Sequence, residues 1–125
     1  MRTVTGLLIS ITLAITIAPA EATDLSCKGV IHTYEMKQKE GTVDPGAAVV
    51  DLEQKRIATP VGSFRITNIS DDSISFDDPK SKQLVVFGTL DRISGLMRVF
   101  WRHPEDTSKM AMYSELKCSS AKRLF

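Results

Sequence analysis

Apolar and polar residues alternate along much of this chain with a period of two, the pattern of a half-buried β-strand. The clearest case is residues 63–69, in which Phe64 and Ile66 alternate with polar neighbours. Ile69 falls out of this phase, which predicts a strand irregularity near Asn68. No segment has a sustained apolar stripe at helical spacing. The pattern therefore predicts an all-β protein.

Turn-forming residues interrupt the pattern roughly every 8–12 residues, the spacing of strands in a β-sandwich or barrel. Residues 60–62 (Pro-Val-Gly) predict a bend, a bulge or a sheet edge, because proline cannot donate to a strand ladder. Residues 23–26 are expected to be a short lead-in segment, and residues 38–46 a loop. Eight short strands are predicted, at residues 27–36, 47–52, 56–59, 63–69, 73–76, 83–90, 96–103 and 110–118.

Two segments carry more specific local predictions. Residues 83–90 form a continuous apolar run rich in β-branched and aromatic residues, which predicts a central strand covered on both faces. Residues 91–95 predict a hairpin turn. Asp91 is placed to accept hydrogen bonds from backbone N–H groups ahead of it, and Gly95 can adopt a positive φ.

Eight strands joined mostly by short loops predict an antiparallel meander. Such a meander must close into a small barrel or fold over as a sandwich to protect its edges. About 100 residues are few for eight barrel strands around a hollow, so side chains are expected to fill the interior.

The first 22 residues have the order of a secretory signal peptide. Arg2 is the basic start, residues 6–17 are an apolar core of about a dozen residues, and two A-x-A sites end at Ala20 and Ala22. The apolar core is too short for a stable membrane anchor. We therefore predict export to the periplasm of a Gram-negative cell or beyond it, cleavage after Ala20 or Ala22, and one domain over residues 23–125.

The only two cysteines, Cys27 and Cys118, lie near the two ends of the predicted domain. In an oxidising compartment such a pair predicts one structural disulfide. The alternative is a lipoprotein acylated at Cys27. Against it, the position three residues earlier, where a lipobox needs an apolar residue, is Asp24. Two cysteines and two histidines have no metal-ligand spacing, so no metal site is expected.

The whole chain has 16 basic and 15 acidic residues and a net charge of +1. Cleavage after Ala22 would remove one residue of each sign, Arg2 and Glu21, so the balance would not change. This balance argues against nucleic acid or an acidic membrane surface as a partner. The basic tail at residues 117–125 is expected to be a solvated end. No motif implies a cofactor.

Catalytic candidates are few. His32 and His103 could each act as a general base, but no nucleophile motif accompanies them, and surface or strand-end roles are expected. The acidic pairs at residues 71–72 and 77–78 lack the spacing of a calcium loop and suit turns. The sequence therefore predicts a protein without catalytic activity.

The segment around Arg98, Phe100 and Arg102 is the best candidate for a binding site. If Val99 and Trp101 face the core, these three side chains share the opposite face, with an aromatic ring between two guanidinium groups. That arrangement can stack on and pair with an anionic ligand or a partner's carboxylates. The alternative is that a neighbouring strand or the tail covers Phe100 while both arginines reach water.

Several short motifs occur in a familiar order. They are VDLEQK at 50–55, PVGSF at 60–64, DSISF at 72–76, GTLDRISG at 88–95, and YSELKC at 113–118 with RLF at 123–125. Together they resemble small exported proteins of rhizobia and related alphaproteobacteria. The resemblance implies export and a disulfide-bridged β domain. It brings no activity and no catalytic residue.

The functional expectation is an exported, non-catalytic β domain that binds a protein or a small ligand. Two alternatives are kept open. One is a lipocalin-like carrier of a small hydrophobic or anionic ligand, and the other is a secreted inhibitor or stress-related accessory protein. The sequence indicates neither the partner nor the oligomeric state.

Overall fold

The computed structural model describes residues 22–34 and 39–121. The predicted signal peptide, apart from Ala22, lies outside these residues. Within the described part of the chain, no helix is long and apolar enough to cross a membrane.

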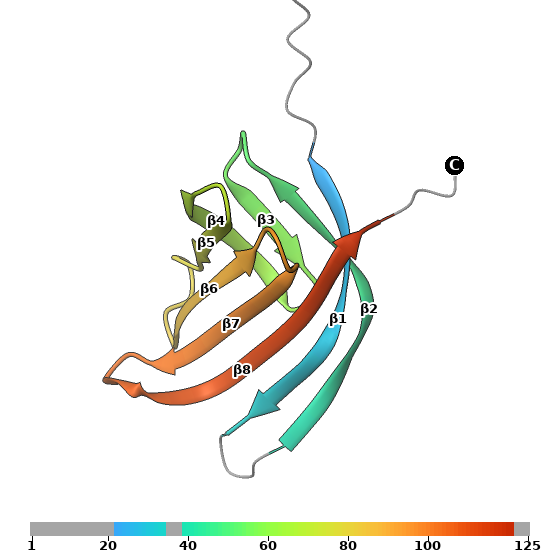
Figure 1. The fold of residues 1–125 in the computed structure, drawn as a ribbon. Helices are drawn as coiled ribbons and strands as arrows, with labels where there is room; N and C mark the ends of the chain where they lie inside the picture. Colours follow the sequence, from blue (N-terminus) through green and yellow to red (C-terminus); the bar gives the residue numbers. More distant parts are fainter. Residues whose placement is uncertain (1–21, 35–38, 122–125) are drawn as a thin grey trace, which may run out of the picture.

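The described chain forms eight antiparallel strands in sequence order, and β8 pairs with β1 to close a barrel (Figure 1). The prediction of an eight-stranded meander is therefore confirmed, with the barrel as the form of closure. The strands are β1 (Thr23–Thr33), β2 (Lys39–Asp51), β3 (Arg56–Thr59), β4 (Gly62–Ile69), β5 (Ser73–Asp77), β6 (Val85–Asp91), β7 (Leu96–His103) and β8 (Asp106–Ser120).

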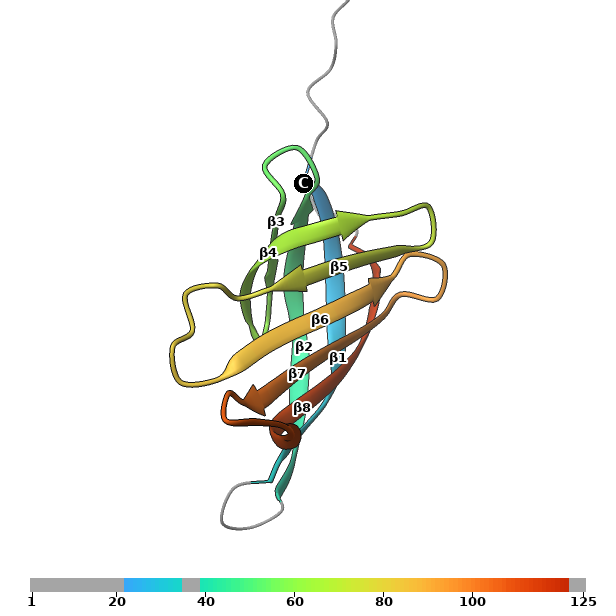
Figure 2. The same cartoon turned by 90° about the vertical axis from the view of Figure 1, so that its left-hand side faces the viewer.

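The barrel interior holds the hydrophobic core, because alternate residues of each strand point inward. The strands β4 to β7 run obliquely across β1 and β2, which lie behind them in Figure 2. Side chains from both groups meet between them. The largest fully buried side chains include Ile57, Phe76, Val99 and Leu116. These side chains fill the middle of the barrel, as expected for a chain of this length.

The strand irregularity near Asn68 is confirmed. The register of β4 against β5 shifts between Ile66 and Asn68, which places a bulge at Thr67. Residues 60–61 form the predicted turn between β3 and β4.

Two predictions about β1 and β2 are wrong. The lead-in at 23–26 belongs to β1, and the loop predicted at 38–46 is strand from Lys39 onward. The register between the two strands shifts between Cys27 and Gly29, opposite Asp44 and Pro45. An irregular strand of this kind tolerates a proline that the sequence pattern alone assigns to a loop.

The prediction that 83–90 is covered on both faces is also wrong. Buried and exposed residues alternate along β6, and Val85 and Phe87 remain 40% and 37% exposed. A single sheet rolled into a barrel has one buried face. The outward apolar residues of β6 therefore belong to the surface.

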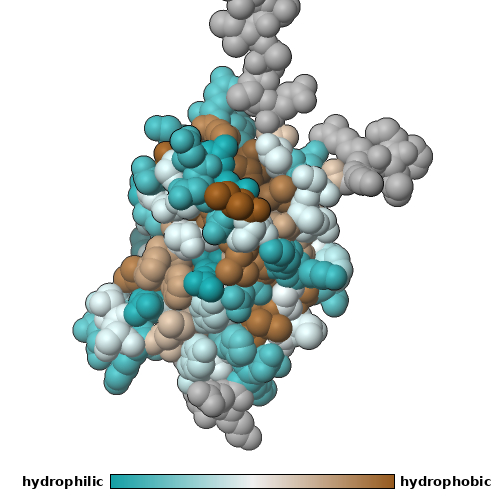
Figure 3. Space-filling model, viewed as in Figure 1, coloured by the Kyte–Doolittle hydropathy of each residue, from teal (hydrophilic) through white to brown (hydrophobic). Residues whose placement is uncertain are grey.

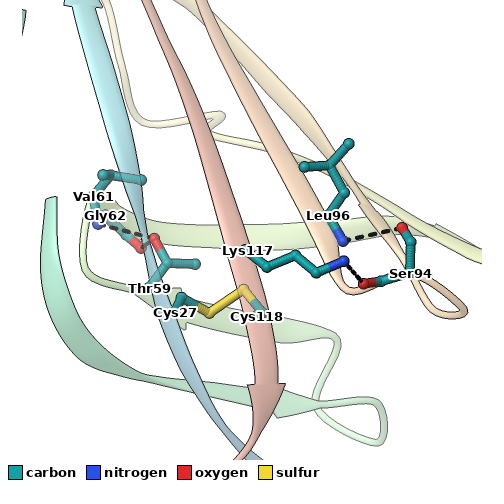
Figure 4. Close-up of a disulfide and its surroundings, with 8 residues drawn as sticks. All are labelled: Cys27, Thr59, Val61, Gly62, Ser94, Leu96, Lys117 and Cys118. Atoms are coloured by element: carbon teal, nitrogen blue, oxygen red, sulfur yellow. Dashed lines mark hydrogen bonds between the residues drawn. A yellow bond between two sulfur atoms is a disulfide. The ribbon is translucent and has the colours of Figure 1, made fainter. Parts of the chain in front are cut away.

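The predicted disulfide joins Cys27 and Cys118, which lie directly opposite each other in β1 and β8 (Figure 4). Their Cα atoms are 4.1 Å apart, and both side chains are buried. The bond links the first and last strands where the barrel closes. A cysteine in this bond has no thiol to acylate, so the structure favours the bridge over the lipoprotein alternative. A structural disulfide indicates an oxidising compartment.

The predicted hairpin turn at 91–95 is confirmed in detail. The Asp91 carboxylate accepts hydrogen bonds from the backbone N–H groups of Ile93 and Ser94, at 2.8 and 2.9 Å. Gly95 has φ of +79°. The N–H of Cys118 donates to the Gly95 carbonyl at 2.8 Å, so the turn is fastened to the disulfide-bearing end of β8.

Candidate functional site

Arg98, Phe100 and Arg102 lie on the outer face of β7. Val99 and Trp101, with exposed fractions of 0% and 8%, point into the core. The predicted alternation along this strand is therefore confirmed. Phe100 is half-buried, so it is neither fully covered nor fully open.

Phe100 belongs to a row of rings that crosses four neighbouring strands. Phe87 of β6 pairs with Phe100, Phe100 with Tyr113 of β8, and Tyr113 with His32 of β1. The ring centroids are 5.2, 5.1 and 6.2 Å apart in that order. Cross-strand aromatic pairs stabilise a sheet, but on the outside of a barrel they also present apolar surface to solvent. We call these four residues the aromatic row.

The surface at this row is apolar beyond its four rings. Tyr34, whose ring lies 6.3 Å from that of His32, is 39% exposed, and Val85 on β6 is 40% exposed. Apolar side chains exposed at neighbouring positions are typical of interaction surfaces.

Arg102 lies over the row. Its guanidinium carbon is 5.5 Å from the ring centre of Phe87 and 5.6 Å from that of Phe100, within cation–π range. One terminal nitrogen donates to the Thr107 carbonyl at 2.7 Å. Its buried Nε has no hydrogen-bond partner among the described residues. Within the described part of the chain, the guanidinium is thus held in place by rings and one carbonyl, without a carboxylate.

Arg98 flanks the row on the same face. Its Nε lies 3.6 Å from a carboxylate oxygen of Glu115, and the two side chains are 49% and 40% exposed. An exposed ion pair of this kind contributes little to stability. Arg98 can therefore exchange Glu115 for another carboxylate at low cost.

On β1, β7 and β8 the outer face around the row is basic, while Glu40 of β2 lies directly opposite His32. Lys28 and Lys117 lie directly opposite each other in β1 and β8, although like charges in that position repel. The Lys117 ammonium donates to the Ser94 carbonyl (Figure 4). Over residues 26–34, 96–102 and 111–117, the outward side chains include four cations (Lys28, Arg98, Arg102 and Lys117) and one carboxylate, Glu115.

Tyr113 supplies a hydroxyl in the middle of this face. Burial, with a smaller contribution from the Glu115 carboxylate, raises the pKa of the Tyr113 hydroxyl above its ordinary value. The hydroxyl therefore stays protonated at neutral pH and can donate a hydrogen bond to an anionic group.

The remaining candidates have local partners. His32 belongs to the aromatic row, and the His103 ring nitrogen lies 3.9 Å from the Glu105 carboxylate. Asp77 forms a two-bond pair with Arg65, at 2.9 and 3.1 Å, and Asp78 accepts from the Lys80 N–H. Among residues 22–34 and 39–121, no group of three or more His, Cys, Asp or Glu side chains is arranged to hold a metal ion.

Sequence reasoning identified Arg98, Phe100 and Arg102, but it missed Phe87, Tyr113 and Tyr34 as parts of the same surface. Phe87 and Phe100 are 13 positions apart in the sequence, and each falls within an apolar segment. Only the strand register brings them together.

The chemistry of this face is stacking combined with charge pairing. Half-exposed rings offer contact area at low entropic cost, while Arg98, Arg102 and the Tyr113 hydroxyl offer donors to an anion. Comparisons of the chain with protein-family models, with curated proteins and with solved structures give no match.

Proposed function

We propose that this protein is an exported interaction module of the periplasm or the extracellular space. It has no catalytic role. The outer face formed by the aromatic row, Arg98 and Arg102 binds a protein partner that presents carboxylates beside an apolar side chain. The observation that carries the proposal is the aromatic row itself, four rings in register on the outside of a barrel.

The charge distribution supports an acidic partner. Arg102 is desolvated by Phe87 and Phe100 but has no carboxylate partner in the described structure, and the Arg98–Glu115 pair is loose. Arginine and aromatic residues are the types in which interfaces concentrate their binding energy. Two incoming carboxylates would each pair with one guanidinium group, while an apolar side chain covers the exposed ring of Phe87.

Export is supported by the signal-peptide pattern of residues 1–22 and by the disulfide. A secreted inhibitor would be a special case of the same function, in which the acidic partner is an enzyme.

The test is a titration of the purified, oxidised protein with a hexapeptide of alternating glutamate and phenylalanine, followed by NMR. We expect saturable shifts of the Nε–H signals of Arg98 and Arg102 and of the backbone amides around Phe100 and Tyr113. The affinity should fall as salt is added, because exposed charge pairs are screened within a Debye length of about 8–10 Å.

The variant Arg98→Ser/Arg102→Ser removes the cations and keeps the rings, so it should lose binding and remain folded. The matched control is Arg56→Ser/Arg65→Ser, which removes two outward arginines that face each other on β3 and β4. Equal loss of affinity in both double variants would show that net charge alone attracts the peptide, and the proposed site would be wrong.

A further inference from the structure

A second site lies at the end of the barrel where β1 begins and where β2, β6 and β8 end. A pocket of about 340 Å³ opens there, within the usual range for small-ligand sites. Hydrophobic surface is visible in this region, between the β6–β7 turn and the ends of β1 and β8 (Figure 3). The pocket shares no residue with the aromatic row.

The floor of the pocket is aliphatic. Its side chains come from four strands and from the residue after β2, and they continue the hydrophobic core toward the barrel end. Val50, Ile74 and Leu90 are buried, while Leu25 and Leu52 are half-buried at the opening. The core is therefore closed in the middle of the barrel and open at this end.

The rim of the pocket is polar with little net charge. It carries one acid and one base, Asp91 and Arg92, and both are already engaged. The Asp91 carboxylate accepts hydrogen bonds from two backbone N–H groups of its own turn. A terminal nitrogen of Arg92 donates a hydrogen bond to the Ser70 carbonyl at 2.7 Å. The remaining polar lining residues are hydroxyls: Thr23, Ser94, Ser119 and Ser120.

The rim is also held in place from two sides. The turn at 91–95 is fastened to β8 by the hydrogen bond between Cys118 and Gly95, at 2.8 Å. The Arg92 N–H donates to the Asp72 carbonyl at 2.8 Å, which joins the same turn to the β4–β5 turn. A site fixed in this way costs little ordering on binding.

We propose that this pocket binds a single-chain amphiphile with an uncharged polar head, of the monoacylglycerol class. The acyl chain contacts Leu25, Leu52 and the buried floor. The head lies among the hydroxyls of Ser94, Ser119 and Ser120, which can both donate and accept hydrogen bonds. Among residues 22–34 and 39–121, a charged head would find no unengaged charge of opposite sign at this rim, so an uncharged head fits best.

The test is a titration of the purified, oxidised protein in its exported form with 1-decanoylglycerol below its micelle concentration, followed by methyl NMR. We expect saturable shifts confined to the methyl groups of the aliphatic lining residues Leu25, Val50, Leu52, Ile74, Leu90 and Ile93. Affinity should rise roughly fourfold per added methylene from the hexanoyl to the decanoyl compound, the effect of burying each group in an apolar site. Decanoate and decyltrimethylammonium should both bind more weakly than the uncharged compound.

Leu52→Trp places a larger side chain at the opening and should reduce affinity on the order of tenfold. Arg56→Ser/Arg65→Ser, on β3 and β4 and outside both sites, should leave it unchanged. The two proposals are tested separately, because the pocket and the aromatic row share no residue and each is titrated with its own ligand. Affinity that does not depend on chain length, or methyl shifts outside the pocket lining, would overturn the proposal, and the ligand series needs no variant to show this. Binding that appears only after truncation following Ala121 would also overturn it, because the chain's own end would then be the occupant.

Discussion

Gly95 shows how a single residue fixes the position of a turn. Its φ of +79° is a conformation that a residue with a Cβ rarely adopts, and a Cβ built at this position would lie 2.1 Å from the Cys118 carbonyl oxygen. Both constraints act at the point where the 91–95 turn is fastened to β8. The role of Asp91 and the backbone of Gly95 were predictable from sequence because turn chemistry is local. The contact with Cys118 was not, since it joins residues far apart in the chain.

We therefore expect Gly95→Val to destabilise the protein by about 1–3 kcal/mol or more, through backbone strain and the clash with the Cys118 carbonyl. Urea unfolding measures this loss. Gly41→Val is the control, because a Cβ at Gly41 would lie 3.3 Å from the Ile31 Cγ2 and 3.9 Å from the Ile31 carbonyl oxygen, without the severe overlap found at Gly95. Equal and small losses in the two variants would mean that the turn relaxes around the new side chain.

The Asp91 carboxylate makes the same turn sensitive to acid. The hydrogen bonds from the Ser94 and Ile93 N–H groups lower the pKa of Asp91 below its ordinary value. A carboxyl whose pKa is lower in the folded state contributes stability above its unfolded pKa of about 3.9, and loses it as pH falls through the folded pKa. The hydroxyl and N–H of Ser108 lower the pKa of Asp106 in the same direction.

Asp91→Asn should therefore lower the melting temperature at pH 7 and differ little from the wild type in strong acid, where the wild-type carboxyl is also neutral. Thermal unfolding between pH 7 and pH 2 measures this difference. If the deficit of the variant were constant over the whole pH range, the ionised carboxylate would not be what stabilises the turn.

The strands show which parts of a barrel the local pattern can predict. All eight strands were predictable, because the alternation of apolar and polar residues and the turn residues that flank it are features of the local sequence. The extent of β2 was not, since residues 39–46 are held extended by pairing with β1 and not by their own apolar pattern. The exposure of Phe87 was misjudged for a related reason. An apolar run has the same sequence whether one face or both are covered.

The disulfide stabilises the arrangement of the strands, because it links β1 to β8. Closing a loop of about 90 residues is expected to contribute roughly 4–5 kcal/mol in the chain-entropy model. Reducing the wild-type protein, and separately making Cys27→Ala/Cys118→Ala, should each lower the urea midpoint by the amount that this loss predicts. A midpoint unchanged by reduction would show that pairing between β1 and β8 closes the barrel without the bond.

In the whole molecule, closure of the barrel creates the binding face that we propose. The aromatic row exists only because four strands align Phe87, Phe100, Tyr113 and His32 in one line, and register of that kind depends on bulges and closure. The sequence pointed to the three residues of β7 because they lie on one strand. It could not show the neighbours that turn them into a surface.

Packing within the aromatic row also determines which variant is a clean test of the binding face. Phe100 lies between the rings of Phe87 and Tyr113, so Phe100→Ser removes two ring contacts and should cost about 1 kcal/mol for each. The loss of binding in that variant would be mixed with a loss of stability. Arg98→Ser/Arg102→Ser leaves the rings in place and separates recognition from folding.

The most direct test of the binding face is photo-cross-linking in the exporting cell, with p-benzoylphenylalanine at position 87 on the aromatic row. The same group at position 63, an exposed residue of β4, is the control. We predict a discrete adduct with an acidic partner from position 87, absent from position 63 and strongly reduced by Arg98→Ser/Arg102→Ser at an unchanged melting temperature. The same adduct from both positions, or an adduct from position 87 that persists without the two arginines, would contradict the proposed function.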